Sequence, residues 1–214
     1  MNKAFVIGDV HGHLDRLENL LSKVSPTQED TIIQLGDLGH FGNENPSADI
    51  ATYKYAIEHK INVLWGNHDY ATVSPTHRFA GYKRPDNSFY PLLREANLKI
   101  AAISHGYLLS HAGLHPSFAP ATSLTNEELL KYIETNIDLQ DTIGRSRGGH
   151  SLFGGILWRD DAEDLWTGIP QIFGHTSSST IRKEGLSYCI DIGKKDENSL
   201  AGIWLPSLKI VTVE

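Results

Sequence analysis

The stretch Phe5-Val6-Ile7-Gly8-Asp9-Val10-His11-Gly12 carries an apolar run directly into a loop built from glycine, aspartate and histidine. Three consecutive large apolar residues before a Gly-Asp break predict a short buried strand. Apolar residues then recur at three- and four-residue spacing over 14–24, which predicts an amphipathic helix that ends at Ser25-Pro26. Strand, polar loop and helix in this order indicate the repeating unit of an α/β protein.

The same order recurs further along the chain. A predicted strand over 31–35 runs into Gly36-Asp37-Leu38-Gly39, and a predicted helix over 48–60 follows it. Another predicted strand over 61–65 runs into Gly66-Asn67-His68-Asp69. Strands that each end in glycine and a polar cluster predict an α/β fold with layered sheets, and we expect one domain over 1–214.

The rest of the chain is predicted to add strands and a helix. The stretch 70–91 shows no clear period and is predicted to be a long loop. Strands over 98–103 and 107–110 flank Ser104-His105-Gly106 as a hairpin, and Thr125-Asn126-Glu127-Glu128 predicts the capped start of a helix over 125–137. Further strands are predicted over 169–173, 186–192, 201–205 and 208–213, with the last turn at Pro206-Ser207.

Composition narrows the possible functions. The 214 residues are 40% hydrophobic and 21% charged, as is usual for a globular protein, and the single Cys189 excludes a disulfide scaffold. No apolar run approaches the roughly 20 residues of a membrane span, so we expect a cytoplasmic protein without a membrane partner. A balance of 19 basic against 26 acidic residues disfavours a large nucleic-acid footprint but allows a small phosphorylated ligand in a local positive pocket. The oligomeric state is left open.

Two later histidines also follow apolar strands, His111 in Leu108-Leu109-Ser110-His111 and His175 in Ile172-Phe173-Gly174-His175. Aspartate, histidine and asparagine together suit divalent transition metals of intermediate hardness. Asp9 and His11 stand two apart in extended chain, point to the same side and can hold one ion. Asn67 can hold a second ion together with the two later histidines.

The carboxylate of Asp37 can bridge both ions. Two divalent ions and two aspartates leave a net charge of about +2, which attracts a phosphate dianion even on an acidic protein. Paired metals roughly 3.5–4 Å apart clamp a phosphoryl oxygen and generate a hydroxide nucleophile. Asn67 fits this centre because another carboxylate would cancel the charge that binds substrate. His68 is then free of metal and is the candidate general acid for the leaving group.

These motifs resemble those of calcineurin-like metallophosphoesterases. They are most similar to the phosphoprotein phosphatase branch, with its bacterial and phage serine/threonine phosphatases and the symmetrical diadenosine tetraphosphatases. The resemblance covers nearly the whole chain, from Gly8-Asp9-Val10-His11-Gly12 to Cys189-Ile190-Asp191-Ile192-Gly193 and a closing hairpin. The single histidine of Gly174-His175-Thr176 is typical of that branch.

The resemblance implies a four-layer αββα sandwich of mixed sheets with two divalent metal ions at its mouth. Manganese is the first choice of metal, with iron, zinc or nickel as alternatives. The implied ligands of the first metal are Asp9, His11 and Asp37, and those of the second are Asp37, Asn67, His111 and His175. His68 is the implied general acid.

The second motif, Gly36-Asp37-Leu38-Gly39-His40-Phe41-Gly42, departs from the Gly-Asp-x-x-Asp-Arg-Gly pattern of the branch. His40 stands where the family's aspartate orients the catalytic histidine. An imidazole there can hydrogen-bond to His68 but lacks the fixed negative charge. Phe41 stands where the family's arginine clamps phosphate, so a bidentate contact is lost.

Another arginine is therefore expected to bind substrate. We expect Arg159 in this role, because Leu157-Trp158-Arg159-Asp160 resembles the family's Leu-Trp motif. Arg145 and Arg147 in the glycine-rich stretch 144–155 are the alternatives.

The predicted function is metal-dependent hydrolysis of phosphomonoesters, phosphoproteins among them, by attack of a hydroxide held on two metals. The alternative enzyme is a nucleotide hydrolase that cleaves a dinucleoside polyphosphate or a cyclic phosphodiester. The non-enzyme alternative is a metal-binding scaffold. In it, the altered phosphate-binding residues would no longer support turnover. The presence of His68 argues against the scaffold.

Overall fold

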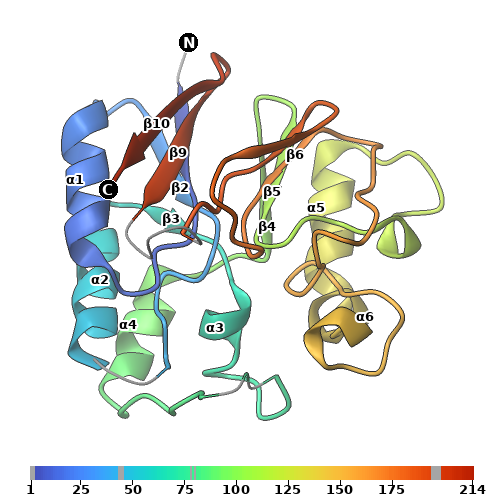
Figure 1. Cartoon of the computed structure of the whole chain (residues 1–214), viewed down its shortest axis with the longest axis horizontal. Helices are drawn as coiled ribbons and strands as arrows, with labels where there is room; N and C mark the ends of the chain where they lie inside the picture. Colours follow the sequence, from blue (N-terminus) through green and yellow to red (C-terminus); the bar gives the residue numbers. More distant parts are fainter. Residues whose placement is uncertain (1–2, 43–45, 78, 80, 194–198) are drawn as a thin grey trace.

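Two sheets pack face to face in the described part of the chain, and helices cover the outer face of each (Figure 1). The computed structural model describes residues 3–42, 46–77, 79, 81–193 and 199–214. The first sheet has the strand order β10-β9-β1-β2-β3. Its strands are β1 (Ala4–Ile7), β2 (Thr31–Gln34), β3 (Asn62–Val63), β9 (Leu200–Leu205) and β10 (Lys209–Val213).

The second sheet has the order β4-β5-β6-β8-β7. Its strands are β4 (Ala101–Ser104), β5 (Tyr107–Ser110), β6 (Gln171–Phe173), β7 (Arg182–Glu184) and β8 (Ser187–Cys189). Both sheets are mixed: β1 pairs in parallel with β2 and antiparallel with β9, while β5 pairs in parallel with β6 and antiparallel with β4. The parallel pairs place several strand ends at one edge of each sheet.

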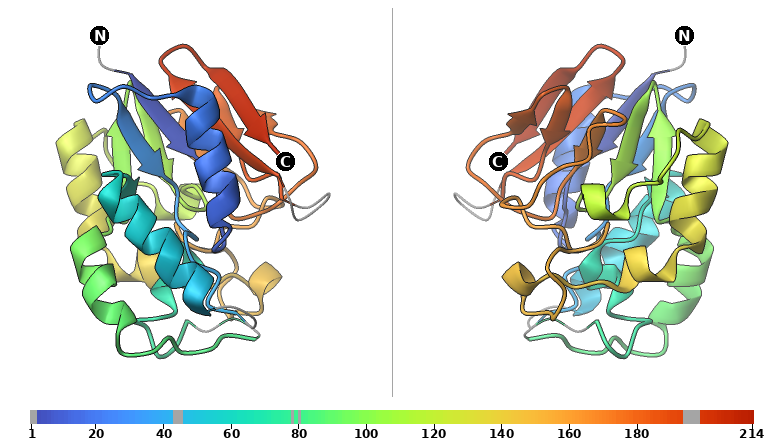
Figure 2. Two further views of the ribbon diagram at one scale, coloured as in Figure 1. Left: turned by 90° about the vertical axis from the view of Figure 1, so that its left-hand side faces the viewer. Right: turned by 90° about the vertical axis from the view of Figure 1, so that its right-hand side faces the viewer.

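The helices divide between the two outer faces, as the side views show (Figure 2). Those on the first sheet are α1 (Leu14–Val24), α2 (Pro46–Glu58) and α4 (Phe89–Ala96), and those on the second are α5 (Asn126–Thr135) and α6 (Ile137–Asp141). Short turns add α3 (Asn67–Tyr70), η1 (Pro116–Phe118) and η2 (Arg145–Arg147). No helix in the described residues is long and apolar enough to cross a membrane.

The alternation of side chains along β1 explains the layering. Phe5 and Ile7 pack into the core under α1, α2 and α4, whereas Ala4 and Val6 pack into the core between the two sheets. Successive side chains of a strand point to opposite faces, so one apolar run of four residues serves two cores. A third core under α5 and α6 completes the layers. The predicted four-layer αββα sandwich is confirmed.

Most predicted elements are present with shifted ends. The helix over 14–24 matches α1, and Ser25 ends it in the left-handed region with φ 45°. The capped start at Thr125 is observed, because Thr125 and Glu128 bond each other's main-chain N–H. The predicted hairpin closes at His105 and Gly106, which both have positive φ, as a tight two-residue turn requires.

The prediction of one loop over 70–91 is wrong at its end, because α4 begins at Phe89. The helix α6 and the strand β7 were also not predicted. Phe89 packs against Phe41 and Tyr53 with ring centroids 4.9 Å away from each, so tertiary packing holds this short helix in place.

A buried carboxylate fastens the loop after β2 to the loop after β3. Oδ2 of Asp69 accepts hydrogen bonds from the main-chain N–H groups of Asp37 at 2.6 Å and Gly66 at 3.1 Å. Oδ1 accepts from Gly39 N–H at 3.1 Å and from the hydroxyl of Tyr53 at 2.8 Å. Burial raises the pKa of Asp69 to about 6, so the group is ionised at pH 7.5 and its charge strengthens these bonds.

We expect Asp69→Asn to destabilise the fold strongly. The amide keeps one acceptor but turns an N–H donor toward other N–H donors, so the free energy of unfolding should fall by about 3 kcal/mol or more. Tyr53→Phe is the matched control, because it removes a single hydrogen bond and should cost about 1 kcal/mol. Denaturant unfolding at pH 7.5 in the presence of a chelator measures both. An Asp69→Asn loss no larger than that of Tyr53→Phe would contradict the anchoring role.

Candidate metal centre

The predicted ligands all stand just beyond strand ends. Asp9 and His11 follow β1, and Asp37 follows β2. Asn67 opens α3 after β3, while His111 and His175 follow β5 and β6 of the other sheet. Since the two sheets face each other, these ends meet and bring all six side chains together.

Asp37 lies at the centre of the cluster. Its Oδ2 atom is 3.8 Å from Nε2 of His11 and 3.6 Å from Nε2 of His111. These two histidines belong to the ligand sets expected for different metals, so the Asp37 carboxylate faces both sets. Ligand atoms of Asp9, Asp37 and His111 also lie within 4.8 Å of one another.

The second ligand set converges closely. Oδ1 of Asn67 lies 2.8 Å from Nε2 of His111 and 2.9 Å from Nδ1 of His175, and the two ring nitrogens are 3.1 Å apart. The Nδ1 atom of His111 lies 3.1 Å from the carbonyl oxygen of Leu35, so Nδ1 carries the proton and Nε2 is left with its lone pair toward Asn67. Two acceptor atoms at this distance fit a cation bound between them.

The ring nitrogens that face the cluster are Nε2 of His11, Nε2 of His111 and Nδ1 of His175. The opposite nitrogens of His11 and His175, Nδ1 and Nε2, are buried without a hydrogen-bond partner among the described residues and point away from the cluster. The donor set of carboxylate, imidazole and amide oxygen fits divalent transition metals in chemistry as well as in position.

The electrostatics of the cluster point the same way. Burial raises the pKa of Asp9 well above its usual range, and the nearby charges of Asp191 and Asp37 add to the effect. Burial likewise lowers the pKa of His111 to about 3, so its imidazole is neutral at pH 7. Crowded carboxylates and neutral imidazoles leave a site without positive charge, which a metal ion would supply.

The backbone at the ligands is strained. His11, Asp37 and His175 adopt positive φ values of 51°, 53° and 71°, a region that side-chain-bearing residues seldom occupy. Such strain clusters at functional sites. The glycine before Asn67 is also required, because a Cβ atom on Gly66 would lie 2.0 Å from Oδ1 of Asp37.

His68 is oriented by the main chain of His40. Nδ1 of His68 lies 2.6 Å from the carbonyl oxygen of His40, so Nδ1–H donates and Nε2 faces Oδ2 of Asp37 at 3.9 Å. The imidazole of His40 is the contact expected from the sequence, but its ring lies edge-on, 5.3 Å from the ring of His68. A carbonyl thus provides the acceptor that an aspartate side chain provides in the family's usual pattern.

The ring of Phe41 points away from the centre. Phe41 is buried and packs against Phe89 with ring centroids 4.9 Å apart. At this position the side chain builds the core under the helices and cannot contact phosphate.

Arg159 does not fit the phosphate-binding role expected from the sequence. Its side chain is only 1% exposed, and its guanidinium donates to the carbonyl oxygens of Ala112 and Glu163 and stacks 4.8 Å from the ring centre of Phe173. Main-chain carbonyls accept from its Nε and Nη1 atoms, and this buried, bonded guanidinium argues against the expected phosphate contact. Arg145 is exposed and bonds the carbonyl of His150.

Arg147 borders the centre. Its Nη2 atom bonds the hydroxyl of Thr176, the neighbour of His175, and its Nε lies 2.7 Å from Oδ2 of Asp160. Its charge contributes to lowering the pKa of both His111 and His175. Its side chain remains 28% exposed.

Three buried aspartates around the centre were not among the predicted site residues. Asp69 anchors Asp37, Asp49 accepts hydrogen bonds from the N–H groups of His40 and Phe41, and Asp191 raises the pKa of Asp9. Asp191 lies within the predicted strand over 186–192, whereas in the structure β8 ends at Cys189 and Asp191 stands beyond a strand end, as Asp9 and Asp37 do. Asp49 had no sequence signal, because it lies within a predicted helix.

Comparison with known proteins gives one family and several relatives. A family model described as calcineurin-like phosphoesterase matches residues 3–188. The symmetrical bis(5'-nucleosyl)-tetraphosphatase of Chromobacterium violaceum is 23% identical over 172 residues, which cover 75% of this chain and 60% of that protein. The chain spans three-fifths or less of the length of such curated relatives.

Solved structures share the fold. A "putative diadenosine tetraphosphatase" superposes with a TM-score of 0.61 at 21% identity, covering 99% of this chain and 93% of that one. A protein serine/threonine phosphatase from Saccharomyces cerevisiae superposes with a TM-score of 0.62 at 17% identity, covering 100% and 80%. At these identities the likeness shows the fold alone. The family model, however, covers most of the sequence, and the chain belongs to the calcineurin-like phosphoesterase family.

Proposed function

We propose that this chain is a metal-dependent phosphoesterase that hydrolyses phosphate esters or anhydrides at a two-metal centre. The observation that carries the proposal is the position of Asp37, whose Oδ2 lies 3.8 Å from His11 and 3.6 Å from His111. One carboxylate therefore faces the ligands of both expected ions, as a bridging ligand must.

The residues around Asp37 supply the two ligand sets. Asp9, His11 and Asp37 would hold one ion, and Asp37, Asn67, His111 and His175 would hold the other. When bound, two divalent ions supply positive charge for a phosphate dianion and Lewis acidity that activates water. We expect manganese, with iron, zinc or nickel as alternatives.

His68 is proposed to move the proton. Its Nδ1–H is fixed on the carbonyl of His40, and burial lowers the pKa of His68 to about 4, so Nε2 is unprotonated at neutral pH. Nε2 is therefore the atom that would take up a proton from solvent water and donate it to the departing oxygen. Since the ring of His68 stacks on that of Phe79, with ring centroids 3.7 Å apart, it is held in place for this transfer.

Arg147 is proposed to bind the phosphate in place of the family's missing arginine. Asp160 and Thr176 orient its guanidinium beside His175, and part of the side chain stays exposed. A guanidinium offers paired donors that match phosphate oxygens.

The names of similar proteins support two substrate classes. The curated relatives are named symmetrical tetraphosphatases, which favours a nucleotide, whereas structural neighbours include a serine/threonine phosphatase, which favours a phosphoprotein. A catalytically silent metal scaffold is the third alternative. The presence of an oriented His68 beside the ligands favours an enzyme.

The proposal is tested by release of phosphate from p-nitrophenyl phosphate. We expect chelator-treated protein to be inactive and Mn²⁺ to restore turnover, with two ions per chain by elemental analysis. Asp37→Asn should lose both ions, because a neutral amide is a poor bridge. At most one ion in fully loaded protein would contradict the two-metal centre, and no turnover with any metal would favour the scaffold. Phosphoserine and phosphotyrosine peptides, diadenosine tetraphosphate and cyclic nucleotides then separate the substrate classes.

His68→Asn should keep both metals but lower kcat by about 10²–10⁴, the usual contribution of a positioned acid. The loss should be smaller for p-nitrophenyl phosphate than for an alkyl phosphate, because a good leaving group needs less protonation. His40→Ala is the matched control: it keeps the carbonyl that holds His68 and should change kcat much less. An equal loss for both leaving groups would show that His68 is not the acid.

Arg147→Ala should lower kcat/KM about 10- to 150-fold, since a charge-assisted contact contributes about 1.5–3 kcal/mol. Arg147→Lys should recover part of the loss, because a point charge cannot replace the guanidinium fork. Arg159→Lys is the contrasting variant: it should lower the unfolding temperature, because Arg159 serves buried carbonyls. Steady-state kinetics and thermal unfolding measure the two effects. Wild-type kinetics in Arg147→Ala would refute the assignment.

A further inference from the structure

A cavity of about 610 Å³ opens beside the metal-ligand cluster. Its inner wall includes His11 and His40, and its outer wall is the segment from Lys83 to Asp86. The volume lies within the range of about 300–1,000 Å³ typical of small-molecule sites. A substrate whose phosphate reaches the centre therefore has room for a sizeable second part.

The cavity lies on the side where the proton donor is held. His40 lines the cavity, and its carbonyl fixes the ring of His68. The ring of His40 lies 5.4 Å from that of His11 and 5.3 Å from that of His68. Since His68 is proposed to protonate the departing oxygen and lies beside His40, the group attached to that oxygen would extend toward this cavity.

Two cations stand on the outer wall. The main-chain N–H of Lys83 bonds the carbonyl of Phe41 at 2.9 Å, which fastens this segment to the loop that bears Asp37. Nε of Arg84 bonds the hydroxyl of Tyr90 at 3.2 Å, and its guanidinium lies 6.0 Å from the centre of that ring. The main chain of Lys83 and the side chain of Arg84 are thus attached to other parts of the fold beside the cavity.

The rest of the lining is apolar or already hydrogen-bonded. Phe41, Ile50 and Pro85 contribute apolar surface. The carboxylates in the lining accept from main-chain N–H groups: Asp49 from His40 at 2.8 Å and from Phe41 at 3.1 Å, and Asp86 from Ser88 at 2.8 Å. The lining thus combines apolar surface with two cations and two carboxylates, so a ligand with an apolar ring system fits it, and negative charge on that ligand would lie at Lys83 and Arg84.

We propose that the cavity binds the leaving group of a nucleoside polyphosphate, with Lys83 and Arg84 contacting the phosphates beyond the scissile bond. This inference rests on the proposed function and names its substrate class. Water forms the new O–P bond, the P–O bond to the leaving phosphate breaks, and one proton of the water ends on that leaving oxygen or in solvent. Cations at Lys83 and Arg84 would stabilise the charge of the departing nucleotide.

The test compares two substrates on the metal-loaded full chain. For the double variant Lys83→Ala/Arg84→Ala we expect kcat/KM for diadenosine tetraphosphate to fall about tenfold or more, mainly through KM. The loss for p-nitrophenyl phosphate should stay below about threefold, because its leaving group carries no further phosphate. ADP, as an inhibitor of p-nitrophenyl phosphate hydrolysis, should bind the variant at least about tenfold more weakly. Salt should weaken ADP inhibition of the wild type more than that of the variant.

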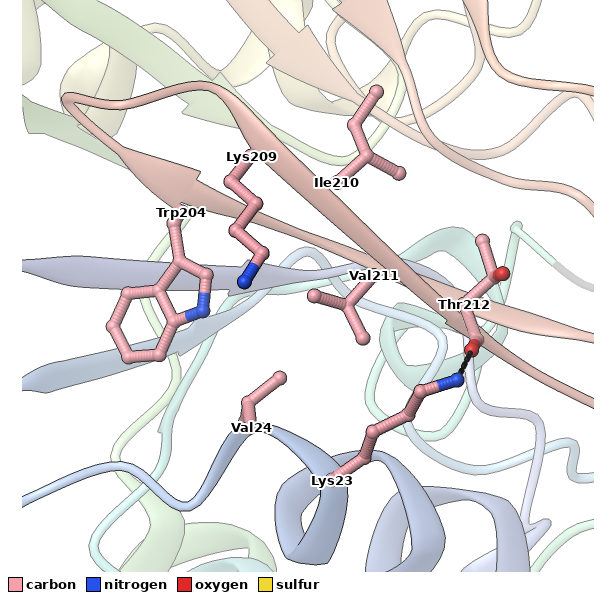
Figure 3. A pocket seen from close by; sticks show the side chains of 7 residues that line it. All are labelled: Lys23, Val24, Trp204, Lys209, Ile210, Val211 and Thr212. Carbon is pink, nitrogen blue, oxygen red and sulfur yellow. Dashed lines mark hydrogen bonds between the residues drawn. The ribbon is translucent and has the colours of Figure 1, made fainter.

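A matched control comes from the far edge of the first sheet. There a cavity of about 400 Å³ is lined by Lys23 and Lys209, close to Trp204, and Lys23 donates to the carbonyl of Thr212 at 2.9 Å (Figure 3). This cavity shares no lining residue with the one beside the metal cluster. Lys23→Ala/Lys209→Ala removes the same charge and should leave both substrates unaffected.

The outcomes separate this inference from the proposed function. Wild-type protein inactive on every phosphorylated substrate would refute the proposed function itself. If the wild type is active and Lys83→Ala/Arg84→Ala keeps the same preference between diadenosine tetraphosphate and p-nitrophenyl phosphate, the cavity assignment is overturned. The proposed function is not affected by that result. Equal losses on both substrates would place the two cations at the reacting phosphate and also overturn it. A phosphoserine peptide preferred by the wild type and lost in the variant would assign the cavity to protein substrates instead.

Discussion

The carboxylate of Asp69 is the constraint on which the metal centre depends. It gathers the N–H groups of Asp37, Leu38, Gly39 and Gly66 and the hydroxyl of Tyr53, so one buried charge ties two strand-end loops to the helix layer. Asp37 can hold its positive φ because these bonds surround it. Without them, the loop after β2 would be free to relax, and the carboxylate that faces both ligand sets would move. Asp69 therefore positions the metal-ligand cluster through the main chain of the two loops that carry Asp37 and Asn67.

The fold was largely predictable because local signals agree with tertiary packing. Four apolar residues in β1 serve two cores, and the leucines of α1 repeat at helical spacing, so burial and pattern coincide. The helix α4 gave no such signal: it is eight residues long and contains Pro91. Proline is tolerated there because it lies in the first turn, where the N–H has no partner within the helix. Contacts with Phe41 and Tyr53, which no local pattern reveals, hold this helix in place.

The candidate site was predictable in its ligands and less so in its surroundings. Strand-end position and residue type marked Asp9, Asp37 and His111 as ligands of one two-metal cluster, and their ligand atoms lie within 4.8 Å of one another. The choice between Arg147 and Arg159 depends on which guanidinium is consumed by buried carbonyls, and a sequence does not show that. The support of His68 was equally hidden, because it comes from a main-chain carbonyl. The chemistry of a side chain can be inferred from the sequence. Its main-chain hydrogen-bond partners depend on the conformation of loops in the folded protein, which the sequence pattern does not show.

The groups that destabilise the metal-free fold are concentrated at the metal-ligand cluster. Bound metal ions would reduce that destabilisation. Crowded carboxylates at Asp9 and Asp37, neutral buried imidazoles and left-handed ligand backbones all weaken the metal-free fold. Ions that bind the folded chain and not the unfolded one stabilise it by mass action, so metal affinity and stability are coupled. The centre would then carry positive charge on a protein of net charge -7. Electrostatic attraction for phosphate would then be confined to the metal-ligand cluster. Selectivity between different phosphorylated substrates must come from the residues that surround the cluster.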